Sequence, residues 1–376
     1  MRNFSKVYFC LFFLCSFISA YAKAQEQVFH AETSAQEIWD SNFSRTPAAD
    51  AEKITVTSAG VSFDERFGRQ RLVAIWHVSN YQHDELSDFD ATLHEGQVRW
   101  NGQFGSDFNT EIEGLRNAHL ADQWEFFEKD IVSRDDLKAK VGFGNDNRLT
   151  FHLGGRQTRQ IHSNSLLEEL NFDEKETYVD AGYQTANNST LVLRIRSGNR
   201  FYVETPLDIF DFDFQQLELE STWKVSPKTS ITATFAHVER KGVINDGSGE
   251  LATINMQWEA SPKLRLESGY SLSQPAVGET VDTPSKVQTY FISAHWQFTD
   301  KVNISSSGSY VKRYYEPTAE LNRIETLTVL APFVITYEPN KSLNIILNTG
   351  WRDNQSPDIS REYTSLQATL GIVLRY

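Results

Sequence analysis

The stretch WKVSPKTSI (Trp223–Ile231) returns three times in altered form, as WEASPKLRL (Trp258–Leu266), WQFTDKVNI (Trp296–Ile304) and YEPNKSLNI (Tyr337–Ile345). Each copy has an aromatic residue, a short segment rich in Asn, Asp, Ser, Pro and Lys, and a new run of alternating apolar and polar residues. These are the residues that tight turns need. The copies start at intervals of 35, 38 and 41 residues. The phrase therefore predicts a strand end, a turn and a strand start, repeated along the chain.

Weaker copies of the phrase precede these four. Their sequences are SFDERFGRQRLVAIW, RWNGQFGSDFNTEI, GFGNDNRLTF and YQTANNSTLVL, with aromatic residues at Phe63, Trp100, Phe143 and Tyr183. One further interval of 39 residues past Tyr337 reaches Tyr376. Two membrane-crossing strands of about 9–11 residues, a short turn and a longer loop account for a period of about 40 residues. A propeller blade would need four strands in each repeat.

Alternation with a period of two is clear in the C-terminal run YTSLQATLGIVLRY (residues 363–376). Leu366, Leu370 and Leu374 share one face, and the aromatic marker Tyr376 lies on the same face. A soluble β-sandwich also alternates, but it gives no reason for an aromatic residue at every strand end. An interfacial aromatic girdle does. The pattern therefore favours a transmembrane β-barrel over a soluble all-β fold.

The strand count follows from the nine aromatic markers. Nine strands end at them and eight strands follow the first eight, and an even total requires one more strand before Phe63. The segment QVFHAETSAQEIWDSNF (residues 27–43) is the only candidate. We predict an all-β, antiparallel, up-and-down transmembrane barrel of about 18 strands, with 16 as the alternative. Short periplasmic turns and long extracellular loops would join the strands of one domain, residues 25–376.

The N-terminal residues 1–24 have the pattern of a cleaved signal peptide. Arg2 and Lys6 precede an apolar segment, and Ala22-Lys23-Ala24 fits a cleavage site. Both cysteines lie in this segment, so we expect none in the mature chain. Its removal would change the net charge from −14 to −17, which argues against a nucleic-acid partner. We expect the outer membrane of a Gram-negative bacterium, with outer-membrane lipids as partners and the barrel-assembly machinery recognising Tyr376.

Two N-terminal phrases resemble a known family. WDSNFSRTP (Trp39–Pro47) and VSFDERFGRQRLVAIWHVSNYQ (Val61–Gln82) are similar to the opening hairpins of the β-barrel porins encoded in exopolysaccharide operons, the EpsL-type family. The resemblance implies a non-enzymatic barrel that takes part in export or surface assembly of an exopolysaccharide, with a polysaccharide and other export-system proteins as partners. A general diffusion porin for small solutes is the alternative, and an outer-membrane barrel hydrolase is a third.

Charged residues on the lumen-facing positions supply the first candidate site. Arginine forks match carboxylates and phosphates, so inward arginines could order an anionic solute. Most inward charges have an oppositely charged residue on the next strand, as TEIEG has in LKAKV and RIR has in LELE. We expect these to neutralise one another. Arg148, Arg156 and Arg159 show no such partner in the sequence, and we take them as candidates for contact with substrate in the lumen.

The second candidate is the loop NAHLADQWEFFEKDIV (residues 117–132). Trp124, Phe126 and Phe127 could stack on a carbohydrate, or the loop could pack against the rim or fold inward as a constriction. The sequence contains no Gly-x-Ser-x-Gly, His-Glu-x-x-His or Gly-rich phosphate motif. We therefore expect no enzymatic activity, no catalytic residues, no cofactor and no metal.

Overall fold

The computed structural model describes residues 28–144, 148–203, 208–316 and 323–376. The signal peptide predicted at residues 1–24 lies outside the described residues. In the part that the structure describes, no helix is long and apolar enough to cross a membrane.

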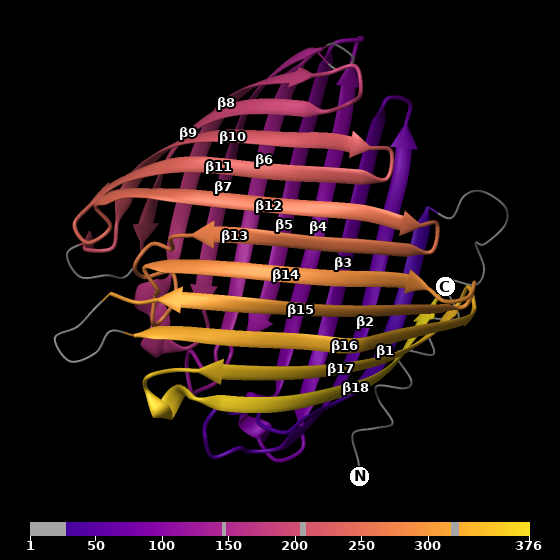
Figure 1. The fold of residues 1–376 in the computed structure, drawn as a ribbon, viewed down its shortest axis with the longest axis vertical. Helices are drawn as coiled ribbons and strands as arrows, with labels where there is room; N and C mark the ends of the chain where they lie inside the picture. The colour runs from indigo at the N-terminus through magenta and orange to yellow at the C-terminus, as the bar shows by residue number, and fades with distance from the viewer. Residues whose placement is uncertain (1–27, 145–147, 204–207, 317–322) are drawn as a thin grey trace.

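Eighteen antiparallel strands form one closed sheet (Figure 1). The strands are β1 (Phe29–Asp40), β2 (Glu52–Phe67), β3 (Gln70–His83), β4 (Ala91–Phe104), β5 (Phe108–Leu120), β6 (Ile131–Phe143), β7 (Leu149–His162), β8 (Phe172–Gln184), β9 (Thr190–Tyr202), β10 (Phe212–Ser226), β11 (Thr229–Gly242), β12 (Gly247–Ser261), β13 (Leu264–Ser273), β14 (Lys286–Gln297), β15 (Val302–Tyr314), β16 (Ile324–Asn340), β17 (Leu343–Gln355) and β18 (Tyr363–Arg375). Each strand pairs with its neighbours in sequence, and β1 pairs with β18. The predicted count of 18 is confirmed, and the alternative of 16 is wrong.

The barrel closes through the segment whose alternation in the sequence is weakest. Strand β1 pairs with β2 from Phe29 opposite Phe63, and with β18 from Glu32 opposite Arg375. The N–H of Tyr376 donates to the carbonyl of Ala31 over 2.8 Å. Because closure pairs the backbone groups of both edge strands, no free sheet edge is left in the wall.

The outer surface of the wall is apolar, and the aromatic markers lie on it. Trp223, Trp296 and Tyr376 keep 55, 45 and 52% of their surfaces exposed, which would be costly in water. Between the ends of β14, Ile292 is 64% exposed on the same face. Such a surface needs lipid as its solvent, so the exterior is the membrane-facing side of the barrel. The aromatic markers lie on this lipid-facing exterior, as their predicted position at the membrane interface requires.

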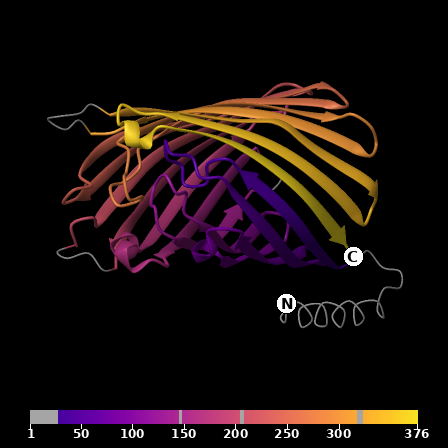
Figure 2. The ribbon, with the colours of Figure 1, turned by 90° about the horizontal axis from the view of Figure 1, so that it is seen from below.

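The two ends of the barrel differ in the length of their connections. At the marker end the turns are short, and those that follow β2 and β4 use Gly68 and Gly105, each at φ 64°. Glycine adopts this left-handed conformation without the steric cost that a side chain adds. The opposite end carries the longer connections 41–51, 121–130 and 274–285. Figure 2 shows the steep tilt of the strands between the two ends. Short turns at the periplasmic end and long loops at the other are typical of outer-membrane barrels.

Candidate functional site

The lumen wall formed by β4 to β10 carries a continuous set of ion pairs. Lys140 lies 3.3 Å from Glu111, and Lys138 lies 3.3 Å from Glu113. Further along the wall, Arg196 lies 3.2 Å from Glu218. These are cross-strand pairs of opposite sign, which stabilise a sheet locally. The predicted mutual neutralisation of these lumen charges is confirmed.

The three arginines singled out from the sequence occupy three different environments. Only Arg156 faces the lumen, and it has an acidic partner after all, because its Nε donates to Oδ1 of Asp136 over 2.8 Å. Arg159 lies on the outer face, with Nε 3.9 Å from Asp173. Arg148 lies exposed at the short-turn end, just before β7. The expectation that all three are lumen groups without acidic partners is wrong, since strand parity and diagonal contacts set these environments.

The loop between β5 and β6 (residues 121–130), named here the β5–β6 loop, folds into the barrel mouth. The ring centroid of Trp124 lies 4.3 Å from the guanidinium carbon of Arg313 on β15 and 5.1 Å from that of Arg361. Asp122 accepts a hydrogen bond from Nη1 of Arg352 on β17 over 3.0 Å. Neither β15 nor β17 is a neighbour of β5 or β6 in the sheet. The loop therefore crosses the lumen, which confirms the inward-folded alternative.

The two phenylalanines of this loop differ in exposure. Phe127 is 67% exposed, and Phe126 is partly buried. A carbohydrate contact by Trp124, Phe126 and Phe127 stays a prediction.

A buried carboxylate fixes the base of the β5–β6 loop. Asp130 is fully buried and lies 2.7 Å from Nδ1 of His162, while the N–H groups of Ser163 and Asn164 donate to it over 2.8 and 3.0 Å. Burial alone would raise the pKa of Asp130, but the hydrogen bonds from His162 and these backbone groups outweigh it and hold the pKa below its ordinary value. The anchor therefore depends on an ionised Asp130.

We expect acid to loosen this anchor. Because the pKa is depressed in the folded state, the stabilisation is fully present above the unfolded value of about 4 and is lost as the pH falls through the folded pKa. Single-channel recordings should show more current fluctuation below about pH 4. The variant D130N should fluctuate already at pH 7 and change little with acid. D135N is the matched control, because Asp135 pairs with Arg116 on the outer face. A D130N channel as quiet as D135N would contradict the role of this anchor.

A second inward loop joins β13 to β14 (residues 274–285), named here the β13–β14 loop. Ala276 is 1% exposed and packs in an apolar cluster with Phe172, Tyr202 and Phe212. Glu279 lies 3.0 Å from Nη1 of Arg200 on β9. Asp282 pairs with Arg323 and lies 3.3 Å from Nη1 of Arg361. This loop thus links the β8–β12 wall with the β16–β18 wall. Arg361 contacts both loops, through Trp124 of one and Asp282 of the other.

The phrase WDSNFSRTP forms a buried clamp at the same mouth. Arg45 donates to both carboxylate oxygens of Asp40, over 3.0 Å from Nη1 and 2.7 Å from Nη2. The Asn42 side chain donates to the carbonyls of Thr46 and Thr364, the latter on β18. Nε of Arg45 lies 3.6 Å from Asp122, which ties the clamp to the β5–β6 loop. The spacing of Asp, Asn and Arg in this phrase therefore serves the architecture of the constriction.

Glu325 is the buried carboxylate that organises the arginines beside the two loops. It is fully buried, accepts from Nε of Arg361 over 2.8 Å and from the hydroxyl of Tyr315 over 3.3 Å, and lies 3.5 Å from Nε of Arg323. Burial, together with the charge of Glu325, raises the pKa of Tyr315 to about 12. Tyr315 therefore stays a neutral donor and adds no negative charge to the constriction.

Arg313 differs from the other arginines of the constriction. It stacks on Trp124, yet no carboxylate of the described residues lies within 4.0 Å of it. Its Nη1 is buried and finds no hydrogen-bond partner among the described groups, and the same is true of Nε of Arg323 and Nη2 of Arg361. Burial raises the pKa of the nearby Glu125, and the Asp122 carboxylate raises it further, against the opposing charge of Arg313. What sets Arg313 apart is therefore that this partly exposed guanidinium has no carboxylate partner among the described residues.

No pattern in the sequence marks Arg313 as a functional residue. It stands among alternating residues of β15, and its importance depends on Trp124, which is 189 positions earlier in the chain. A count of lumen-facing charges treats Arg313 like any other inward arginine. Only the path of the β5–β6 loop sets it apart.

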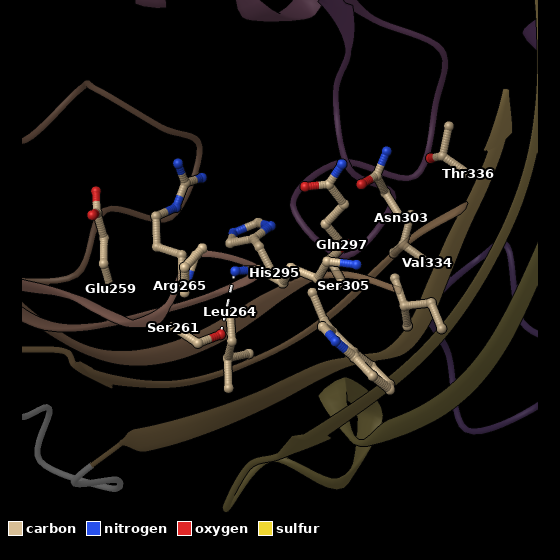
Figure 3. A pocket seen from close by; sticks show the side chains of 14 residues that line it. Glu259, Ser261, Leu264, Arg265, His295, Gln297, Asn303, Ser305, Val334 and Thr336 are labelled. Carbon is tan, nitrogen blue, oxygen red and sulfur yellow. Dashed lines mark hydrogen bonds between the residues drawn. The ribbon is translucent and has the colours of Figure 1, made fainter. Parts of the chain in front are cut away.

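Below the constriction the lumen opens into a polar vestibule at the periplasmic end. A cavity of about 540 Å³ lies along the inner wall of β12 to β16. Figure 3 shows Arg265, His295, Gln297 and Asn303 extending from the strands on one side of this cavity. A second cavity of about 820 Å³ lies on the wall of β2 to β7 and includes Arg69, which donates to the carbonyl of Gly105. Both cavities therefore lie at the short-turn end of the lumen, away from the arginine cluster at the mouth.

The fold is that of solved outer-membrane channels, although sequence comparison finds no relative. No protein-family model and no curated protein sequence matches the chain. OccK9 (OpdG) of Pseudomonas aeruginosa is similar in structure, with a TM-score of 0.54 and 10% identity, over 93% of this chain and 98% of that one. A BenF-like porin of Pseudomonas fluorescens Pf-5 gives 0.52 and 9%, over 93% and 99%. The outer-membrane protein OpdK of P. aeruginosa, crystallised with vanillate, gives 0.51 and 10%, over 93% and 99%.

The expected role in exopolysaccharide export is wrong. The barrels that match over almost their whole length include a porin and a protein crystallised with the small solute vanillate, and nothing among them supports the EpsL-type assignment. The two inward loops agree with this correction, because they narrow the mouth that a polymer would have to pass. The chain is an eighteen-stranded barrel of the Gram-negative outer membrane with the fold of the porins.

Proposed function

We propose that this barrel is a passive, non-enzymatic porin whose constriction favours small solutes that carry a carboxylate. The observation that carries the proposal is Arg313, a partly exposed lumen arginine that stacks on Trp124 of the inward-folded loop and has no described carboxylate within 4.0 Å. A guanidinium that has no carboxylate partner in the protein can offer planar, paired hydrogen bonds to the carboxylate of a solute.

The stacked Trp124 ring supports this role by fixing the guanidinium plane. A held guanidinium loses less side-chain freedom when an anion binds than a free one does. The vestibule below is polar, so a solute that leaves Arg313 meets side chains such as Asn303 and Gln297 with which it can exchange hydrogen bonds. Binding strong enough to attract and weak enough to release is what conduction requires.

Uptake by proteoliposomes tests the proposal. Glucuronate and glucose have similar size, but only glucuronate carries a carboxylate, so we expect glucuronate to enter faster at low concentration. A dextran of several kilodaltons should not enter. Equal entry of both sugars would support the general diffusion porin instead, and no entry of either would refute a porin function.

A further inference from the structure

The outer face of β14 and β15 carries two lysines around one tyrosine at the long-loop end. Nζ of Lys286 lies 4.2 Å from the ring centroid of Tyr314, and Nζ of Lys312 lies 5.0 Å from it. Lys286 stands directly opposite Tyr314 in the strand pair, and Lys312 is opposite Gln288. Two ammonium groups are thus held against one ring, as cation–π contacts permit. We name Lys286 and Lys312 the exterior lysine pair.

Strand parity places this pair on the membrane side of the wall. On β14, Lys286 shares its face with Tyr290 and Ile292, which are 47 and 64% exposed. On β15, Lys312 and Tyr314 flank Arg313, which points to the lumen and contacts Trp124. The exterior lysine pair is therefore separate from the constriction and cannot reach a solute there.

Polar and aromatic side chains extend the pair into a connected patch. The hydroxyl of Tyr314 donates to Oε1 of Gln288 over 3.1 Å, and Nε2 of Gln288 donates to the hydroxyl of Tyr270 over 3.2 Å. The rings of Tyr270, Tyr290 and Tyr310 form a row, with centroids 5.0 and 6.4 Å apart. Aromatic rings in such a row are typical of a membrane interface.

The position along the strand sets the depth of the patch. Trp296 marks the periplasmic interface, and Lys286 lies ten residues before it on the same strand. At about 3.4 Å per residue and a tilt of about 40°, ten residues rise about 26 Å. This equals the height of the apolar band, which is about 25 Å. The two ammonium groups therefore reach the level of the headgroups in the outer leaflet.

The charge of the pair has no counterpart in the described protein. No described carboxylate lies within 4.0 Å of either Nζ. Some other charged groups on the outer face do have such partners, since Arg116 lies 3.4 Å from Asp135 and Arg159 lies 3.9 Å from Asp173. An anion from outside the chain is what would balance the exterior lysine pair.

We propose that this patch binds the phosphorylated acyl disaccharide that anchors lipopolysaccharide in the outer leaflet. One phosphate would accept hydrogen bonds from both ammonium groups, which are donors only. The tyrosine row below would lie along the sugar and the first carbons of the acyl chains, where amphipathic rings are favoured. This site belongs to the assembly of the barrel in its membrane and is independent of the solute that the lumen passes.

Native mass spectrometry of the detergent-purified barrel with added bisphosphorylated lipid A tests this proposal. Each basic group near an anionic lipid surface contributes about fivefold in affinity. Loss of both ammonium groups in K286Q/K312Q should therefore weaken lipid binding about thirtyfold. K286R/K312R should retain binding, because charge and donors remain. K241Q is the matched control, since Lys241 lies on the outer face of β11 opposite Asp213. Both glutamine variants should keep heat-modifiable migration and the glucuronate uptake of the parent.

Three results would overturn the proposal. Equal lipid binding by K286Q/K312Q and the parent would show that the pair does not hold the phosphate. An equal loss in K241Q would show general attraction by surface charge. Displacement of the lipid by inorganic phosphate at the same concentration would make the patch a site for free phosphate.

Discussion

Replacing residues 122–129 with a short Gly-Ser linker is expected to raise single-channel conductance about twofold or more, because pore width sets conduction. The exchange removes Trp124 from Arg313 and Arg361 and removes Asp122 from Arg352, so the segment that crosses the mouth is lost. The closed sheet does not depend on this segment, since its strands pair through their backbones. Planar-bilayer recording measures the change.

The matched control for this exchange is F127S. Phe127 is 67% exposed in the same loop, so its loss should leave the loop in place and the conductance unchanged. Heat-modifiable migration reports whether the shortened barrel folds. If the folded variant conducts like the parent, the β5–β6 loop is not the constriction.

The second large effect is expected from R313Q. Removing a charged donor that meets a carboxylate in a buried site costs about 1.5–3 kcal/mol, so half-block of the current by glucuronate should need roughly ten to a hundred times more solute. The glutamine keeps part of the volume and some donor capacity, so the pore should stay open to glucose. Titration of current block with glucuronate gives the shift directly.

R159Q provides the comparison for R313Q, because it removes the same charge from the outer face of β7. It should leave the glucuronate block unchanged. An equal shift in both variants would mean that overall charge, and not Arg313, attracts the solute. No shift in R313Q would refute the proposed role of this arginine.

The barrel could be predicted from the sequence because its determinants are local and repeated. Each aromatic marker, turn and alternating run follows from backbone and solvent requirements within about 40 residues. Even the poorly alternating first strand followed from the demand for an even count, and β1 does close the sheet against β18. Where the phrase WDSNFSRTP suggested a functional family, the structure shows a buried ion pair between Asp40 and Arg45.

The contacts of the candidate site could not be predicted from the sequence, for a physical reason. The sequence shows no obvious acidic partner for Arg156, Arg159 or Arg148, but Asp136 reaches Arg156 diagonally and strand parity turns Arg159 outward. Trp124 stands in an aromatic loop that the sequence reveals, whereas nothing in the sequence marks its partner Arg313. The contact between them depends on where a loop of ten residues goes once the barrel has closed.

The sequence by itself determined a membrane barrel of eighteen strands, its orientation and its pairing, because alternation and turn chemistry act between neighbours. Only the tertiary structure decided what the lumen presents. Two loops from separate walls meet at Arg361, and the first of them leaves Arg313 stacked but without a carboxylate partner among the described residues. Such contacts join residues that are far apart in the chain, and no local pattern encodes them. They arise because the stacking of Trp124 on Arg313 and the burial of Asp130 and Ala276 fix each loop in the mouth.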